Sequence, residues 1–207
     1  MRFLPTLLLA ATLAAAMPAA QAATLFDNLA AAQQGDDPLQ SFGPLADSFS
    51  TGAQAGLMLT QVTALLKSGN ADVVGDLRVT LHADSANGPG DWLANVGTLS
   101  SAAVSTAAFA AYTFTPATTI QLAAHTTYWI EIEAVSPNAV SWAWSAELGG
   151  TGVAGGSNFS QTLGASLNSA APPYQMSVIA QAVPEPATAA LMLGGVGLVA
   201  AARRRKA

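Results

Sequence analysis

The 207-residue sequence predicts an all-β protein, an antiparallel β-sandwich of jelly-roll-like type. Several short segments alternate apolar and polar residues, which is the two-residue period of half-buried strands. Clusters of Gly, Asn, Pro and Asp separate these segments and supply the backbone angles that tight turns need. Between its two ends the chain shows no long segment of helical period. We therefore expect one domain of ordinary size with short appendages.

Seven segments of the body are expected to be strands. In residues 75–82, Leu77, Val79 and Leu81 alternate with polar side chains. In residues 126–135, Tyr128 and every second residue after it are apolar, whereas Glu131 and Glu133 point to the other face. The remaining strands are expected at 57–66 (LMLTQVTALL), 111–116 (AYTFTP), 119–123 (TIQLA), 139–145 (AVSWAWS) and 174–183 (YQMSVIAQAV).

Two segments lack a clear period. The Ala-rich residues 100–111 are expected to form a loop or an irregular strand. The Gly-rich residues 146–169 are expected to form a long surface loop and not a linker between domains, because the strand predicted after them must return to the sheet.

The amino-terminal residues 1–22 have the three regions of a secretory signal peptide. Arg2 provides a short positive region, and residues 3–17 form an apolar stretch. Ala20 and Ala22 form the small-x-small pattern that signal peptidase accepts, so cleavage is expected after Ala22. The alternative is an uncleaved anchor helix, for which the apolar stretch is short.

The carboxyl-terminal residues 183–207 also have three parts. Pro184, Glu185 and Pro186 form a stiff, extended tripeptide, because proline fixes φ and restricts the residue before it. Residues 187–202 contain no charge, and as a helix they would extend roughly 24 Å at about 1.5 Å per residue, slightly less than a hydrocarbon core. Four basic residues follow where a positive cytoplasmic flank belongs: Arg203, Arg204, Arg205 and Lys206. A membrane helix at 187–202 is therefore expected, with the body of the chain outside.

These three parts, in this order, resemble the PEP-CTERM sorting signal of Gram-negative bacteria. The resemblance covers about the last 25 residues. It implies that an exosortase, a membrane cysteine transpeptidase, recognises Pro184 to Pro186, cleaves near them and transfers the exported part to the cell surface or the extracellular polymer matrix.

The body, residues 23–182, is acidic and has no cysteine. All twelve acidic side chains of the sequence except Glu185 lie in it, whereas Lys67 and Arg78 are its basic residues, which gives a formal charge of −9. Such a body is not expected to bind nucleic acid or an anionic membrane surface. Without disulfides it must be stabilised by its core.

Several segments of the body resemble the choice-of-anchor extracellular domains, particularly type R. They are LFDNL (25–29), LADSFSTG (45–52), LHADSANGPGDWLANVGTL (81–99), LAAHTTYWIEI (122–132) and YQMSV (174–178). The resemblance implies a β-sandwich displayed at the surface, and it supplies no catalytic residue.

No arrangement of residues in the body indicates an enzyme or a cofactor. The sequence has no G-x-S-x-G and no H-E-x-x-H, and the two histidines, His82 and His125, are expected to be ordinary surface residues. Asp84, Asn87 and Asp91 share one loop and form a weak candidate Ca²⁺ site, although their spacing does not follow the D-x-[DN]-x-[DN]-G pattern and turn stabilisation explains them as well.

A ligand surface is the remaining possibility within the body. Trp129 shares its predicted strand face with Glu131 and Glu133, so its ring is expected to be exposed, as sugar-binding rings are. The same two carboxylates could alternatively form the acid pair of a glycosidase.

The sequence thus predicts an exported, surface-sorted protein without catalytic activity, whose role is structural or adhesive in the cell envelope or polymer matrix. The alternative is a carbohydrate-binding module or carbohydrate-active enzyme. The expected partners are signal peptidase and an exosortase, with extracellular polysaccharide as a further candidate. The membrane is expected to hold the tail before processing.

Overall fold

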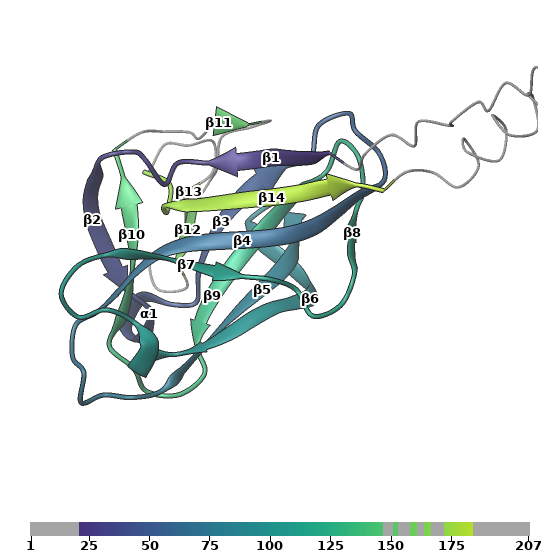
Figure 1. The fold of residues 1–207 in the computed structure, drawn as a ribbon. Coiled ribbons are helices and arrows are strands. Elements are labelled where there is room, and N and C mark those ends of the chain that lie inside the picture. The colour runs from purple at the N-terminus through teal and green to yellow at the C-terminus, as the bar shows by residue number, and fades with distance from the viewer. Residues whose placement is uncertain (1–20, 147–150, 153–157, 161–163, 167–171, 184–207) are drawn as a thin grey trace, which may run out of the picture. The chain divides into compact units, whose positions relative to one another are not determined.

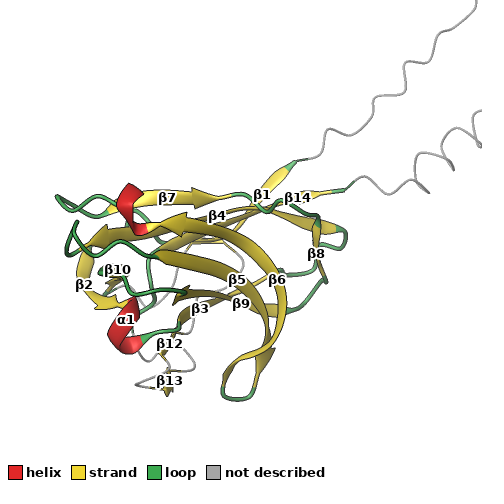
Figure 2. Ribbon diagram, turned by 90° about the horizontal axis from the view of Figure 1, so that it is seen from below, coloured by secondary structure: helices red, strands yellow, loops and turns green. Residues whose placement is uncertain are grey.

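The computed structural model describes residues 21–146, 151–152, 158–160, 164–166 and 172–183. These residues form two antiparallel β-sheets and two short helical turns (Figures 1 and 2). The all-β prediction is thereby confirmed at the level of two antiparallel sheets, and the jelly-roll-like connectivity stays a prediction. The predicted signal peptide up to residue 20 and the tail from residue 184 lie outside the described residues.

Sheet A contains strands from both ends of the body, and sheet B is built mainly from its middle. Sheet A comprises β1 (Ala22–Asp27), β2 (Gln33–Pro38), β4 (Leu57–Ser68), β7 (Ala110–Phe114), β8 (Ile120–Leu122), β10 (Val140–Ser145), β11 (Thr151–Gly152) and β14 (Met176–Ala182). Sheet B comprises β3 (Leu45–Ser50), β5 (Asp76–Ser85), β6 (Gly88–Ser100), β9 (Thr127–Ala134), β12 (Asn158–Ser160) and β13 (Gly164–Ser166). The helical turns are α1 (Leu39–Phe42) and the 3-10 turn η1 (Ser101–Ala103).

The order of strands within each sheet differs from their order in the chain. Sheet A runs β11-β1-β14-β4-β10-β2, with β7 and β8 also paired to β4. Sheet B runs β13-β12-β3-β9-β5-β6, so the 13-residue strand β6 forms one of its edges. Most of these pairings join segments that are distant in the sequence.

The core lies between the two sheets and consists of the apolar side chains that the alternation predicts. Leu77, Val79 and Leu81 of β5 are buried, as are the alternate apolar residues of β9. Each such side chain contributes about 1.5–3 kcal/mol through its removal from water. Trp142 of β10 is fully buried, stacks on Tyr174 at 4.7 Å between ring centroids, and donates its indole N–H to the Gln175 carbonyl oxygen at 2.9 Å. Trp142 therefore points into the core.

All seven predicted strands are present, and the described residues form further strands that the sequence pattern does not indicate. Strand β2 has the polar sequence QQGDDP and lies at an edge of sheet A, where proline is tolerated. Gly35 in β2 allows the Trp144 ring to lie against the strand, because any Cβ there would collide with the ring. The segment 146–169 was predicted to be a loop throughout. That prediction was wrong, because its described residues include β11, β12 and β13.

Buried amide side chains connect the first strand to the last. The Asn28 side chain donates to the Tyr174 carbonyl oxygen at 3.0 Å and accepts from the Met176 N–H at 2.7 Å. The Gln175 side-chain amide donates to carbonyl oxygens of the chain that follows β1, including that of Ala31 at 2.8 Å. Because buried polar groups are costly when unpaired, these bonds fix the register of β1 against β14.

One carboxyl group lies inside the core. Asp47 of β3 has no exposed surface, its Oδ1 accepts from the Ser48 N–H at 2.8 Å, and its Oδ2 has no hydrogen-bond partner in the described part of the chain. Burial raises the pKa of Asp47 well above its usual range, although backbone N–H groups of Ser48 and Tyr174 act in the opposite direction.

Replacing Asp47 with Asn is expected to increase stability at neutral pH. The unfolded chain releases the Asp47 proton near pH 4, whereas the raised pKa retains it in the fold, so stability falls by at most about 1.4 kcal/mol per pH unit as pH rises. The wild type should therefore lose stability relative to Asp47→Asn as the pH rises above about 4, the pKa of the unfolded carboxyl group. Urea unfolding across this range, with the exposed Asp72→Asn as control, tests the difference. An unchanged difference at all pH values would contradict the assignment.

Candidate functional site

The described chain ends where the predicted sorting signal begins. Ala182, the last residue of β14, pairs with Leu57, and the Val183 N–H donates to the Gly56 carbonyl oxygen at 2.8 Å. The predicted motif Pro184 to Pro186, the predicted helix 187–202 and the basic residues Arg203 to Lys206 lie outside the described residues. The helices that the structure describes are too short to cross a membrane. The body is therefore folded up to the residue directly before the predicted motif.

The predicted signal cleavage point lies beside this exit. Ala22 is the first residue of β1 and pairs with Gln181 of β14, whereas Ala20 lies outside the described residues. Strands β1 and β14 are antiparallel neighbours, so the chain enters and leaves the body at the same end of sheet A. Cleavage after Ala22 would remove one residue of β1 and leave its pairing with β14 almost intact.

The predicted ligand surface lies on the face of sheet B that points away from sheet A, which we call the outer face. Here Arg78, Thr80 and His82 of β5 stand beside Glu133, Glu131 and Trp129 of β9, respectively. The structure thus brings the predicted residues Trp129, Glu131 and Glu133 together with three β5 side chains.

The carboxylates of Glu131 and Glu133 each lie beside a basic or titratable side chain of β5. The Arg78 Nε–H donates to Glu133 Oε1 at 2.6 Å. His82 Nε2 lies 3.5 Å from Glu131 Oε1 and 3.1 Å from the Thr80 hydroxyl, and His82 Nδ1 lies 3.0 Å from the Gly90 carbonyl oxygen. Burial raises the pKa of Glu131, and the neighbouring His82 partly opposes that shift. His82 is therefore part of a half-buried polar network and not the ordinary surface residue that was expected.

The predicted exposure of Trp129 is wrong, since its side chain is 1% exposed. Strands β12 and β13, at one end of sheet B, also contact β6 at the other end. Sheet B is therefore curved enough for its two end strands to approach each other. The indole N–H donates to Asp84 Oδ1 at 2.7 Å, which satisfies its polar atom. This ring cannot act as a stacking platform.

A different tryptophan is exposed on the outer face. Trp92 of the edge strand β6 is 57% exposed and pairs with His82. The exposed residues Asn95 and Thr98 of the same strand pair with Thr80 and Arg78. The sequence pattern does not identify Trp92, because bulges in β6 interrupt the alternation that would have indicated a strand there.

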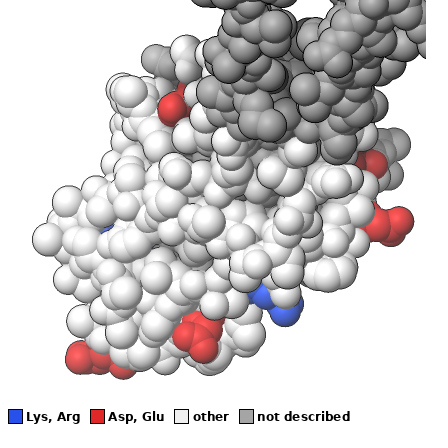
Figure 3. Space-filling model, turned by 45° about the vertical axis from the view of Figure 1, so that its right-hand side comes forward, with Lys and Arg blue, Asp and Glu red and all other residues white. Residues whose placement is uncertain are grey.

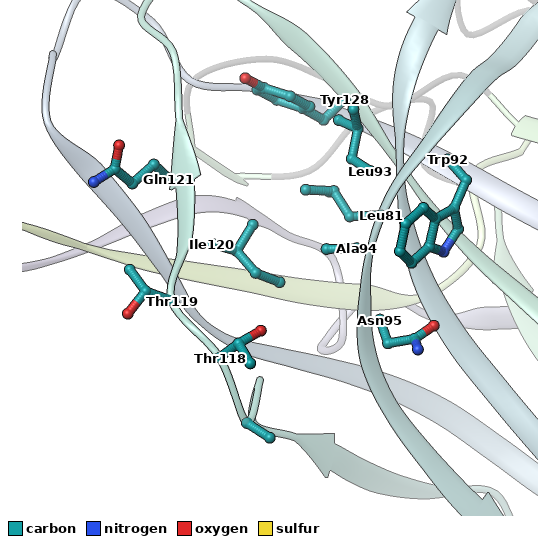
Figure 4. A pocket seen from close by; sticks show the side chains of 11 residues that line it. Leu81, Trp92, Leu93, Ala94, Asn95, Thr118, Thr119, Ile120, Gln121 and Tyr128 are labelled. Atoms are coloured by element: carbon teal, nitrogen blue, oxygen red, sulfur yellow. The ribbon is translucent and has the colours of Figure 1, made fainter.

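A cleft of about 690 Å³ lies between β6 and β8 (Figure 4). Leu81, Ala94 and Ile120 point toward one another across it, and Tyr128 lies at one end, whereas Gln121 points away. Trp92 and Asn95 lie on the opposite side of β6 from Ile120. The cleft is the apolar opening of the core between two sheet edges, and because Trp92 and Asn95 also line it, it borders the outer face at β6.

The weak calcium candidate lies at the tip of the β5–β6 hairpin. Asp84 accepts from the Trp129 indole, and the Asn87 N–H donates to the Ser85 hydroxyl at 3.3 Å within the turn. Among the residues that the structure describes, no three His, Asp or Glu side chains come together as metal ligands. These contacts give Asp84 a structural role in the turn.

Replacing Asp84 with Ala is expected to destabilise the body by about 1–3 kcal/mol, because the buried Trp129 N–H would lose its acceptor. The matched variant Asp91→Ala, on the same hairpin, should change stability by less than about 0.5 kcal/mol. Thermal unfolding with and without Ca²⁺ measures both. A Ca²⁺-dependent rise in Tm that both variants abolish would instead establish the calcium site.

Comparison with known proteins identifies the tail. Residues 182–206 match the PEP-CTERM protein-sorting motif. No curated protein matches the chain, and no solved structure does. The motif indicates an exported protein that passes through the membrane, is processed by an exosortase, a membrane transpeptidase, and is sorted to the cell surface.

Proposed function

We propose that this protein is a non-catalytic structural or adhesive component of the cell envelope or extracellular polymer matrix of a Gram-negative bacterium. The observation that carries the proposal is the position of the sorting motif, whose match begins at the last residue of β14. No described residue of the body separates the folded sheets from the motif. A transpeptidase that acts just beyond Val183 would release the body with its sheets complete.

The contacts of the body support a non-catalytic role. An acid pair for glycoside hydrolysis needs one free carboxylate and one protonated carboxyl group flanking the substrate. Glu133 is hydrogen-bonded to Arg78, and Glu131 lies in the network of His82 and Thr80. The two groups are thus held by their neighbours on the sheet. The resemblance to choice-of-anchor R domains also agrees with display of a binding or structural module.

The intact mass of the protein from its native host tests this function. We expect the mature chain to begin at Ala23 and to end after Val183 but before the apolar run 187–202, because earlier cleavage would remove part of β14. In a host that lacks its exosortase, the chain should retain the tail and remain in the membrane fraction. Its body should be equally resistant to protease in both strains, which controls for folding.

Two results would contradict the proposal. Retention of residues 187–207 in a host with active exosortase would make the tail a permanent anchor. A mature chain that ends before Ile179 would lack most of the pairing between β14 and β4, which is incompatible with a body delivered in the fold seen here.

A further inference from the structure

We infer that the outer face along β6 is a binding site for an uncharged saccharide chain, with Trp92 as the stacking ring and Asn95 and Thr98 as hydrogen-bonding groups. The inference rests on the proposed surface function, since it names the class of ligand that a matrix protein would hold. It concerns residues different from Trp129, which is buried.

The bulges of β6 align these three side chains. In a regular strand, residues three apart point to opposite faces. In β6 the register shifts between Val79 and Thr80, and again between Leu81 and His82, and each shift accommodates an extra β6 residue. Trp92, Asn95 and Thr98 consequently stand beside His82, Thr80 and Arg78, which alternate along β5 on one face. Bulges that re-aim side chains in this way are common next to functional sites.

The aligned side chains form a row of useful length. Their β5 neighbours are two residues apart, so the row has a spacing of about 6.6 Å and a length of about 13 Å at the usual strand rise. It lies at a sheet edge, where a chain-like ligand can extend beyond both ends of the row. The supporting β5 side chains are fixed by their own contacts with β9, including the Arg78–Glu133 pair.

The chemistry of the row fits a saccharide. An exposed indole offers an apolar face to the C–H groups of a sugar ring, while an amide and a hydroxyl offer donors and acceptors to its hydroxyl groups. None of the three side chains is charged, the Arg78–Glu133 ion pair beside them has no net charge, and Glu131 lies 3.5 Å from the His82 ring.

The wider charge distribution selects against polyanions. The body carries a formal charge of −9, which repels anionic polysaccharide. The face of the molecule in Figure 3 is mostly uncharged, with isolated acidic and basic side chains. An uncharged polysaccharide is therefore the ligand class that the surface accepts.

The test uses the mature protein purified from its native host and an array of neutral cello-, xylo- and malto-oligosaccharides beside sulfated and uronic acid-containing ones. We expect binding to one or more neutral chains, with a change in tryptophan fluorescence, because Trp92 is the tryptophan with a largely exposed ring among the described residues. Trp92→Ala should weaken binding about tenfold or more, the equivalent of one lost stacking contact. Trp92→Tyr, which keeps a ring, should retain most of the affinity.

Asn95→Ala should weaken binding several-fold, whereas Val74→Ala, which removes an exposed apolar side chain outside the row, should leave it unchanged. Circular dichroism of each variant controls for folding. The inference is overturned if no neutral oligosaccharide binds, if binding survives Trp92→Ala, or if only anionic glycans or proteins are retained. If the protein is correctly sorted but binds no glycan, the saccharide site is refuted and the proposed function stands. If the protein binds glycan but is never sorted to the surface, the site stands and the proposed function is refuted.

Discussion

The pairing of the first strand with the last is the constraint on which the rest of the body depends. Strand β14 lies between β1 and β4, and β4 carries β7, β8 and part of β10. The buried side chains of Asn28 and Gln175 fix this pairing through bonds to backbone atoms on both sides. In a chain without cysteine, these bonds and the core take the place of covalent cross-links. The same pairing brings the first and last described residues of the body to one end of sheet A.

Alternation identifies most clearly the strands that have one face packed in the core and the other face less buried. Strands β5 and β9 have one face in the core, so their apolar residues alternate visibly. Strand β3 is buried on both faces, and β6 contains bulges, so neither shows a regular alternation. The order of the strands could not be predicted, because it depends on pairings between distant segments, which no local pattern records.

Some residues of the candidate sites could be recognised from sequence, whereas the exposure of others depends on the assembled sheets. The tail could be recognised from sequence because its three parts are contiguous and act as a linear signal. For Trp129, alternation gave the face shared with Glu131 and Glu133 but not its burial, which depends on the assembled tertiary structure. Trp92 is exposed because it stands on an edge strand, and edge position is a property of the assembled sheet.

The central place of β14 also sets the order of events in the life of the chain. It is the last strand to be synthesised and the last to cross the membrane, yet β1 and β4 have no other connecting strand between them. Sheet A therefore cannot be completed before residues 176–182 are available, whereas the strands of sheet B pair without them. The body thus owes its last sheet pairing to the segment that directly precedes the sorting motif.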